Sequence, residues 1–219
     1  HAAHPLMHTP LSSLETKWPE HSMVSGSPFA GGSLPLVVDP MCGTGTCVLE
    51  CAFVWPLATY IMGDNSRAQT EQAAENAAAQ TKHCQSSMRP AACINVVQWD
   101  AAALPLASNT VDVMLCDMPF GRQYGTVASN HTLYPLWLAE FGRVITVGGL
   151  LIALTSETVL MRPNLTRIFT LQSNRPGGAQ TDTDAAVCAE RWRWVEVETL
   201  PMKLGSLHAT LHVWRKTAC

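Results

Sequence analysis

The sequence predicts an α/β domain with a Rossmann-like fold, in which a seven-stranded, mostly parallel sheet carries an antiparallel C-terminal strand. Three observations support this prediction. Short apolar strands alternate with helical segments from residue 36 onward, which is typical of a parallel sheet covered on both faces. A glycine-rich turn follows the first strand, as in domains that cradle a nucleotide-like ligand. Two alternating segments near the C-terminus are joined by a short link, which indicates an antiparallel pair.

The individual elements follow from apolar patterning and from turn residues. Strands are expected over residues 36–39, 58–63, 93–99, 111–116, 150–155, 192–198 and 207–214. Helices are expected over residues 45–54, 66–80, 133–145 and 159–171. The second of these helices is rich in Ala and Gln, which have good helix propensity. Gly148 and Gly149 are expected to end the third helix, and Pro163 restricts the first turn of the fourth.

The pattern predicts one domain that is preceded by a lead-in segment. Residues 1–35 are rich in Pro, His, Ser and Gly, and within them a short helix is expected over 11–17 and a flexible loop over 25–35. Residues 36–219 form the expected catalytic domain, with a Gly- and Pro-containing loop over 173–184. Because His1 is not an initiator methionine and no signal-peptide pattern follows, we interpret the start as a cut inside a longer protein.

The composition restricts the classes of function. Apolar residues make up 47% of the 219 residues, so the chain is not expected to be disordered as a whole. Only 14% of residues are charged, whereas the average is about 25%. The formal net charge is −3, whereas a protein that binds nucleic acid on its own usually carries a basic face. If the target is RNA, we therefore expect most phosphate contacts to lie outside this chain.

The eight cysteines do not suggest a disulfide framework. The chain is large and apolar enough to fold without disulfides, so we expect a reducing compartment, namely the cytoplasm, with a nuclear fraction also compatible. Cys47 and Cys51 lack the spacing and the partners of a zinc site, so no metal is expected. No apolar run reaches about 18 residues, so we expect no membrane span.

Acidic residues follow four of the predicted strands: Asp39, Asp64, Asp100 and Asp117. Ligands of open α/β sheets bind beyond the carboxyl ends of the strands. A single acid at such a place can simply cap the following helix or turn, but four in register favour a binding site. An acid after the second strand commonly takes a ribose diol, and one after the third can accept from an adenine amino group.

The first turn distinguishes among nucleotide-like ligands. It reads Asp39-Pro40-Met41-Cys42-Gly43-Thr44-Gly45-Thr46, and its glycines allow the backbone to approach a ligand closely. No Gly-Lys-Ser/Thr follows, and the residues after Thr46 do not complete G-x-G-x-x-G, so a pyrophosphate ligand is disfavoured. An acid before the glycines suits a cofactor with an amino-acid group, whose ammonium needs acceptors. These features predict S-adenosylmethionine.

A second turn, Asp117-Met118-Pro119-Phe120-Gly121, indicates the kind of group that is methylated. An exocyclic amine on a nucleobase is a poor nucleophile because its lone pair is drawn into the ring. Two acceptors on this amine favour a pyramidal nitrogen, and the Asp117 carboxylate and the Met118 carbonyl can supply them. Pro119 stiffens the turn, and Phe120 offers a face for base stacking. Methyl transfer then depends mainly on alignment.

Together these motifs resemble the catalytic domain of the THUMP-domain-containing RNA guanine-N2 methyltransferases. The resemblance rests on residues 38–45, 63–65, 97–100, 117–121 and 204–209, the last of which read Leu-Gly-Ser-Leu-His-Ala. It covers residues 36–147 and 190–216. The combination of the two turns with the C-terminal segment is what makes it specific to this family.

The resemblance implies S-adenosylmethionine-dependent formation of N2-methylguanosine in tRNA, with the acceptor stem as the expected location. It implies that Asp39, Gly43 and Gly45 hold the methionine part of the cofactor, that Asp64 takes the ribose, and that Asp100 with the Ala101 amide reads the adenine. The full set of expected cofactor-binding residues is Asp39, Pro40, Cys42, Gly43, Thr44, Gly45, Thr46, Asp64, Asn65, Asp100 and Ala101. The expected catalytic residues, which hold the guanine, are Asp117, Met118, Pro119 and Phe120.

The chain departs from the family's pattern in three places, and other functions stay open. The RNA-binding THUMP domain is absent from the sequence, residues 1–35 do not match the family's helical lead-in well, and residues 172–189 resemble an insertion. Guanosine in a small nuclear RNA is an alternative substrate, because the same turn would serve both reactions. A methyltransferase acting on adenine or on a protein amide is a second alternative, although those families favour Asn in place of Asp117. The third is a non-enzymatic assembly surface, against which the four acids argue.

The resemblance also implies a partner, a small zinc-ribbon activator protein that forms a heterodimer with the catalytic domain. The segment over residues 93–99 is apolar and contains no Lys. If it is the edge strand of the sheet, a strand of the partner can add to it. The alternative is that helices and loops of the chain itself cover this edge.

Overall fold

The structure is a computed structural model that describes residues 34–120, 127–166, 169–170 and 191–218. The helix predicted over 11–17 and the loop predicted over 173–184 lie outside these residues, as does nearly all of the lead-in segment. The division of the chain into a lead-in and a catalytic domain therefore stays a prediction.

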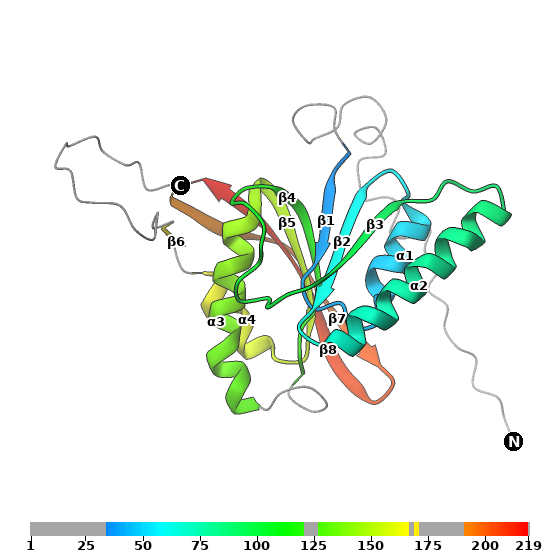
Figure 1. The fold of residues 1–219 in the computed structure, drawn as a ribbon. Coiled ribbons are helices and arrows are strands. Elements are labelled where there is room, and N and C mark those ends of the chain that lie inside the picture. The colour runs from blue at the N-terminus through cyan, green and yellow to red at the C-terminus, as the bar shows by residue number, and fades with distance from the viewer. Residues whose placement is uncertain (1–33, 121–126, 167–168, 171–190, 219) are drawn as a thin grey trace, which may run out of the picture. The chain divides into compact units, whose positions relative to one another are not determined.

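A single sheet runs through the described part of the chain, with the strand order β3-β2-β1-β4-β5-β8-β7-β6 (Figure 1). Its strands are β1 (Leu36–Asp39), β2 (Thr59–Asp64), β3 (Cys93–Gln98), β4 (Val111–Asp117), β5 (Ile145–Thr155), β6 (Phe169–Thr170), β7 (Arg191–Leu204) and β8 (Leu207–Ala218). The first five are parallel, whereas β8 is antiparallel to β5 and to β7. The predicted mostly parallel sheet with a reversed C-terminal strand is confirmed, and the short β6 is an addition to it.

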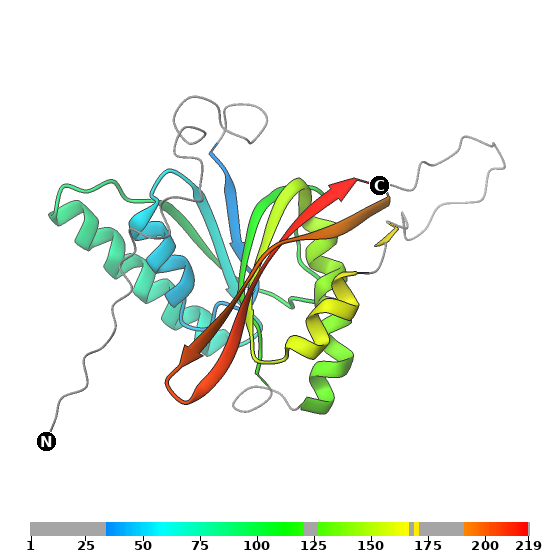
Figure 2. The same ribbon diagram turned by 180° about the vertical axis from the view of Figure 1, so that it is seen from behind.

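Four helices of the described residues cover this sheet: α1 (Thr46–Val54), α2 (Arg67–Ser86), α3 (Val127–Val144) and α4 (Thr158–Leu165). In both ribbon views α1 and α2 lie on one side of the sheet, and α3 and α4 lie on the other (Figures 1 and 2). Within the described residues no helix is long and apolar enough to span a membrane.

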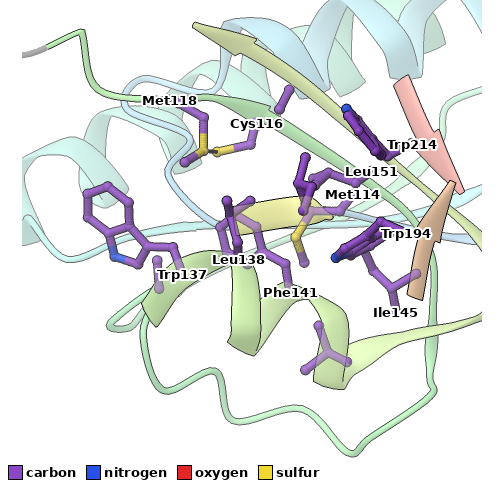
Figure 3. Packing of buried hydrophobic residues seen from close by; sticks show 14 of the residues in the cluster. Met114, Cys116, Met118, Trp137, Leu138, Phe141, Ile145, Leu151, Trp194 and Trp214 are labelled. Atoms are coloured by element: carbon purple, nitrogen blue, oxygen red, sulfur yellow. Dashed lines mark hydrogen bonds between the residues drawn. The ribbon is translucent and has the colours of Figure 1, made fainter. Parts of the chain in front are cut away.

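The main apolar cluster lies between the sheet and α3 with α4. Phe141 and Leu138 of α3 are fully buried against Met114 of β4 and Leu151 of β5 (Figure 3). The cluster extends across β7 and β8 through three buried tryptophans: Trp192, Trp194 and Trp214. This packing places α3 beside the carboxyl end of β4, where the second predicted turn lies.

Two predicted helices are longer in the structure than the sequence indicated. The helix predicted over 66–80 continues to Ser86, because Cys84 extends its buried stripe into the last turn. The helix predicted from residue 133 begins at Val127, so that Pro135, near the start of the predicted helix, lies in the interior of the observed one. The earlier start matters for function, because it adds Asn130 to the helix.

Two other boundaries were predicted wrongly. The pair Gly148-Gly149 does not end α3; the helix ends at Val144 and β5 begins at once. Val111 pairs with Ile145 but Val113 pairs with Leu150, so β5 contains a bulge that the positive φ of Gly148 accommodates. The helix predicted to residue 171 ends at Leu165, and Phe169–Thr170 pair with β7 instead, so tertiary pairing overrides the local helical pattern.

The backbone of α3 lies directly against β7, which generates a prediction about Gly142. A Cβ at this position would overlap the indole ring of Trp192. We expect Gly142→Ala to lower the free energy of unfolding by about 2–4 kcal/mol in urea denaturation, although Ala favours a helix over Gly by about 1 kcal/mol.

The double variant Gly142→Ala with Trp192→Leu isolates this contact. It should lose less stability than the two single variants added together, because the smaller side chain removes the overlap. A Gly142→Ala protein as stable as wild type would contradict the packing of α3 on β7.

Candidate active site

The turn between β1 and α1 is held against β2 by its own backbone. The Gly43 N–H donates to Oδ2 of Asp64 at 3.0 Å. Gly43 and Gly45 have φ angles of 52° and 91°, in the left-handed region that glycine adopts without strain. A Cβ on Gly45 would also lie 2.8 Å from Sδ of Met62. Both glycines are therefore required by the local backbone.

Asp39 ends β1 and is almost fully buried, with 1% of its surface exposed. Its Oδ1 accepts a hydrogen bond from the Met41 N–H at 3.0 Å. Burial raises the pKa of Asp39 to about 7; the bond from Met41 opposes this shift, and the charges of Asp117 and Asp64 add to it. A cation bound nearby would stabilise the ionised form of Asp39 and lower this pKa.

Asp64 ends β2, and both of its carboxylate oxygens bind backbone N–H groups. Besides the bond to Gly43, its Oδ1 accepts from the Ser66 N–H at 2.9 Å. The neighbouring Asn65 is exposed, and its carbonyl accepts from Nε2 of Gln98 at 3.1 Å. A carboxylate has about four acceptor positions, so Asp64 retains capacity for a ligand hydroxyl.

The loop after β3 brings Trp99, Asp100 and Ala101 to the same edge of the sheet. The buried indole of Trp99 donates to the Pro40 carbonyl at 3.0 Å, which ties this loop to the first turn. Asp100 is exposed, and its Oδ1 accepts from the Ala102 N–H at 2.9 Å. Within the described residues the Ala101 N–H makes no hydrogen bond, so it is free to donate to a ligand.

The second turn begins where β4 ends. Asp117 is exposed at the end of the strand, and partial desolvation by the surrounding protein raises its pKa. Met118 is buried, and its N–H donates to the Leu154 carbonyl at 2.9 Å. Its sulfur also contacts the Cys116 thiol at 3.3 Å (Figure 3). Pro119 and Phe120 are half-buried.

The predicted site residues fall into two groups. Asp39, Asp64 and Asp117 lie close enough for their charges to interact, so the structure brings together the ends of three strands. Asp100 lies at the same edge but takes no part in this interaction with Asp39. The other predicted residues of the first turn lie beside Asp39: Pro40 and Cys42 are buried, and Thr44 and Thr46 are exposed.

The thiols around the site are not arranged for nucleophilic or metal chemistry. Burial, with the nearby acids, raises the pKa of Cys42 to about 12 and that of Cys47 to about 11. A thiol with such a pKa is not a thiolate at neutral pH. Among the described residues no group of three or more His, Cys, Asp or Glu side chains is placed to hold a metal ion.

The sequence analysis missed the side chains that hold the second turn. The Pro119 carbonyl accepts hydrogen bonds from Nδ2 of Asn130 and from Oη of Tyr134, each at 3.0 Å. Tyr134 also shares a hydrogen bond with Thr155 at 2.7 Å. Asn130 and Tyr134 are four residues apart and so lie on one face of α3. Recognising the helix start at Val127 would have revealed this polar pair.

Comparisons with known proteins agree with the geometry. Residues 32–173 match the family described as "UPF0020: RMKL-like, methyltransferase domain". Human "tRNA (guanine(6)-N(2))-methyltransferase THUMP3" is 34% identical over 185 residues, which are 83% of this chain and 32% of that protein. Bovine "U6 snRNA (guanine-N(2))-methyltransferase THUMPD2" is 35% identical over 122 residues, which are 56% of this chain and 22% of that protein. The chain thus spans about a third or less of the length of these relatives.

A solved structure shares the fold. TrmN from Thermus thermophilus superposes with a TM-score of 0.58 at 22% identity, covering 84% of this chain and 44% of that one. The chain therefore has the Rossmann-like fold of the S-adenosylmethionine-dependent methyltransferases, and it is a methyltransferase domain. More narrowly, it belongs to the UPF0020, RMKL-like family of methyltransferase domains. The resemblance inferred from the motifs is confirmed by these matches.

The buried Asp39 generates a prediction about stability and pH. Its pKa is about 7 in the folded protein against an ordinary value of 3.8. As pH rises from 4 to 8 the unfolded chain ionises first, so the folded state loses stability over this range. The side-chain amide in Asp39→Asn stays neutral and keeps an acceptor for Met41. We therefore expect this variant to be more stable than wild type at pH 8 by about 2–4 kcal/mol and of similar stability at pH 4.

Urea denaturation of the ligand-free protein at the two pH values measures this effect, and the value at pH 4 serves as the internal control. A stability difference that is the same at both pH values would show that Asp39 is not held in its neutral form.

Proposed function

We propose that this protein uses S-adenosylmethionine to methylate the exocyclic N2 amine of a guanine in tRNA. The observation that carries this proposal is the position of Asp117. It is an exposed acid at the end of β4, beside the buried Asp39 and followed by a turn whose backbone is held from both β5 and α3. An amine that enters this edge of the sheet would meet the Asp117 carboxylate and the Met118 carbonyl. Both lie at the same edge of the sheet as the ends of β1, β2 and β3, where the cofactor is proposed to bind.

The residues at the ends of β1, β2 and β3 suit S-adenosylmethionine. The charges of Asp64 and Asp117 oppose the ionisation of Asp39, so a cationic ligand bound beside Asp39 relieves this repulsion. Asp39 and the turn through Gly43 and Gly45 would hold the methionine part. Asp64 would accept from the ribose hydroxyls, and Asp100 with the free Ala101 N–H would bind the adenine. When bound, this cofactor supplies a methyl group activated by a sulfonium charge.

Asp117 performs two tasks in the proposed reaction. As an acceptor, together with the Met118 carbonyl, it orients the amine so that its lone pair points at the methyl carbon. The new nitrogen–carbon bond forms as the sulfur–carbon bond breaks, and one proton must leave the amine. Because its pKa is raised, the Asp117 carboxylate is a better proton acceptor than an ordinary aspartate. The products are N2-methylguanosine, S-adenosylhomocysteine and this proton.

The choice of tRNA rests on the relatives and not on a surface of this chain. The human relative is named as a tRNA guanine-N2 methyltransferase. With a net charge of −3, the chain has no excess of cations for phosphate binding, so RNA binding is assigned to a THUMP domain outside it.

We also propose that the protein is located in the cytoplasm, with a nuclear fraction. The six described cysteines are free, as in a reducing compartment.

Guanosine in a small nuclear RNA is the second candidate substrate. It is supported by the match to the bovine THUMPD2 protein, whose name gives U6 snRNA as its target. That match covers 56% of this chain, against 83% for the human tRNA enzyme, so tRNA is preferred. Methylation of adenine or of a protein amide is disfavoured by Asp117, because those enzymes favour Asn at that position.

The test is transfer of a tritiated methyl group to bulk tRNA, or to small nuclear RNA, with nucleoside analysis of the product. We expect label in N2-methylguanosine from tRNA. Asp117→Ala should lower transfer by about 100-fold or more while leaving the cofactor Kd within about threefold of wild type. Asp100→Ala should show the reverse, raising the Kd roughly tenfold. Label in adenosine or in protein would contradict the proposal, as would wild-type transfer by Asp117→Ala.

We further propose that a small zinc-ribbon activator adds a strand to β3. β3 is an edge strand of the sheet, which satisfies the condition set by the sequence analysis. Its described neighbour is β2 alone. Val97 is 36% exposed, and Cys93 and Asn95 are also exposed. An apolar edge without Lys favours pairing with another strand.

A charge placed on this edge tests the activator proposal. Val96→Lys should abolish co-purification with the co-expressed activator, because a desolvated ammonium opposes strand addition. Ala74→Lys, which places the same charge on the exposed face of α2, should leave co-purification unchanged. Co-purification of Val96→Lys at the wild-type level would exclude β3 as the docking strand.

A further inference from the structure

The Pro119 carbonyl is the most strongly held backbone group of the second turn. It accepts from Nδ2 of Asn130 and from Oη of Tyr134, each at 3.0 Å. Asn130 and Tyr134 are both fully buried. A carbonyl oxygen has two lone pairs, so these two donors satisfy it completely. The Pro119 carbonyl is therefore not available to a substrate.

The direction of the hydrogen bonds around Tyr134 is fixed by chemistry. Because the Pro119 oxygen can only accept, Tyr134 must give it its single proton. Thr155 must then donate to Oη of Tyr134 across their 2.7 Å contact, and it accepts in turn from the Glu157 N–H at 2.9 Å. The result is a one-way chain from Glu157 through Thr155 and Tyr134 to Pro119. Chains of this kind polarise and strengthen each member.

The peptide groups on either side of the Met118–Pro119 peptide are thus anchored to different elements. The Met118 N–H donates to Leu154 of β5, and the Pro119 carbonyl is held by α3. The peptide between them contains the proline nitrogen and has no N–H. Within the described residues its remaining polar atom, the Met118 carbonyl, accepts no hydrogen bond. Anchoring both neighbours fixes the direction of this free carbonyl.

We propose that Asn130, Tyr134 and Thr155 are positioning residues that aim the Met118 carbonyl and the Asp117 carboxylate at the amine to be methylated. The proposal rests on the proposed function, and it assigns these residues a role through the turn and not through contact with substrate. By occupying the Pro119 carbonyl, the network leaves the amine two acceptors, which is the number that a pyramidal nitrogen with two N–H groups requires.

Asn130 adds a second observation in favour of a functional network. Since the Pro119 oxygen accepts only, the atom that faces it is Nδ2, and the other atom of the amide is Oδ1. This Oδ1 is buried and has no hydrogen-bond partner among the residues that the structure describes. An unpaired buried acceptor costs about 1–3 kcal/mol. An apolar residue at position 130 would avoid this cost, but the hydrogen bond to the Pro119 carbonyl would be lost. Asn130 therefore lowers stability while it holds the second turn in place.

Tyr134→Phe tests the network, and Tyr60→Phe is its matched control. Tyr60 is also fully buried and donates to a backbone carbonyl, that of Trp55 at 2.7 Å, between β2 and the end of α1. The variants are made in the full chain and assayed with tRNA and the proposed activator. We expect Tyr134→Phe to lower kcat by roughly 10- to 100-fold, with the cofactor Kd unchanged. Tyr60→Phe should lose similar thermal stability and keep its kcat.

Thr155 provides the rescue experiment. Thr155→Val keeps the shape of the side chain but removes the donor to Tyr134, so kcat should fall. Thr155→Ser keeps the hydroxyl, and kcat should return toward wild type. Hydrogen exchange of a peptide that contains Met118 supplies a readout apart from activity. Its N–H should exchange faster in Tyr134→Phe and in Thr155→Val than in Tyr60→Phe.

The outcomes separate this proposal from the proposed function. A wild-type protein that methylates no guanine would overturn both. An active wild type with equal kcat in Tyr134→Phe and Tyr60→Phe would overturn the positioning role alone. Equal kcat in Thr155→Val and Thr155→Ser would also overturn the positioning role. Any loss of kcat would then come from the packing of the side chain and not from its hydroxyl.

Discussion

The position of β1 between β2 and β4 is the constraint on which the site depends. Because the three strands are parallel, their carboxyl ends share one edge, and the acids that follow them meet there. Backbone bonds maintain this arrangement: the Cys42 N–H donates to the Gly63 carbonyl at 2.8 Å, and the Trp99 indole reaches Pro40. A ligand at this edge is therefore surrounded by groups that are distant in the chain.

The parts of the site that the sequence predicted are those encoded by short segments. Each strand-end acid adjoins its own apolar strand, so the strand pattern was sufficient to predict that Asp39, Asp64, Asp100 and Asp117 lie at one edge of the sheet, where ligands of such folds bind. The strands were found for the same reason. Boundaries failed at the start of α3, which lies at Val127 and not at residue 133, and at Gly148, which lies in a bulge of β5 and does not end a helix.

The parts that the sequence could not predict depend on contacts between distant residues. The bond from Trp99 to Pro40 spans 59 positions, and its donor reads in the sequence as an ordinary apolar strand residue. The burial of Asp39, and with it the raised pKa, follows from the elements packed around β1 and not from its neighbours in the chain. Tyr134 and Thr155, likewise, meet only because α3 packs across β5.

Asp39 connects stability with binding. A carboxylate kept out of water beside two other acids destabilises the folded state at neutral pH, and an uncharged side chain would avoid that cost. The same arrangement increases the affinity of the edge for a cation, because ligand charge offsets both the desolvation and the repulsion among the acids. Ligand binding to the folded state alone must then stabilise the fold. The electrostatic strain around Asp39 is thus the counterpart of the affinity that we propose for a sulfonium- and ammonium-bearing cofactor.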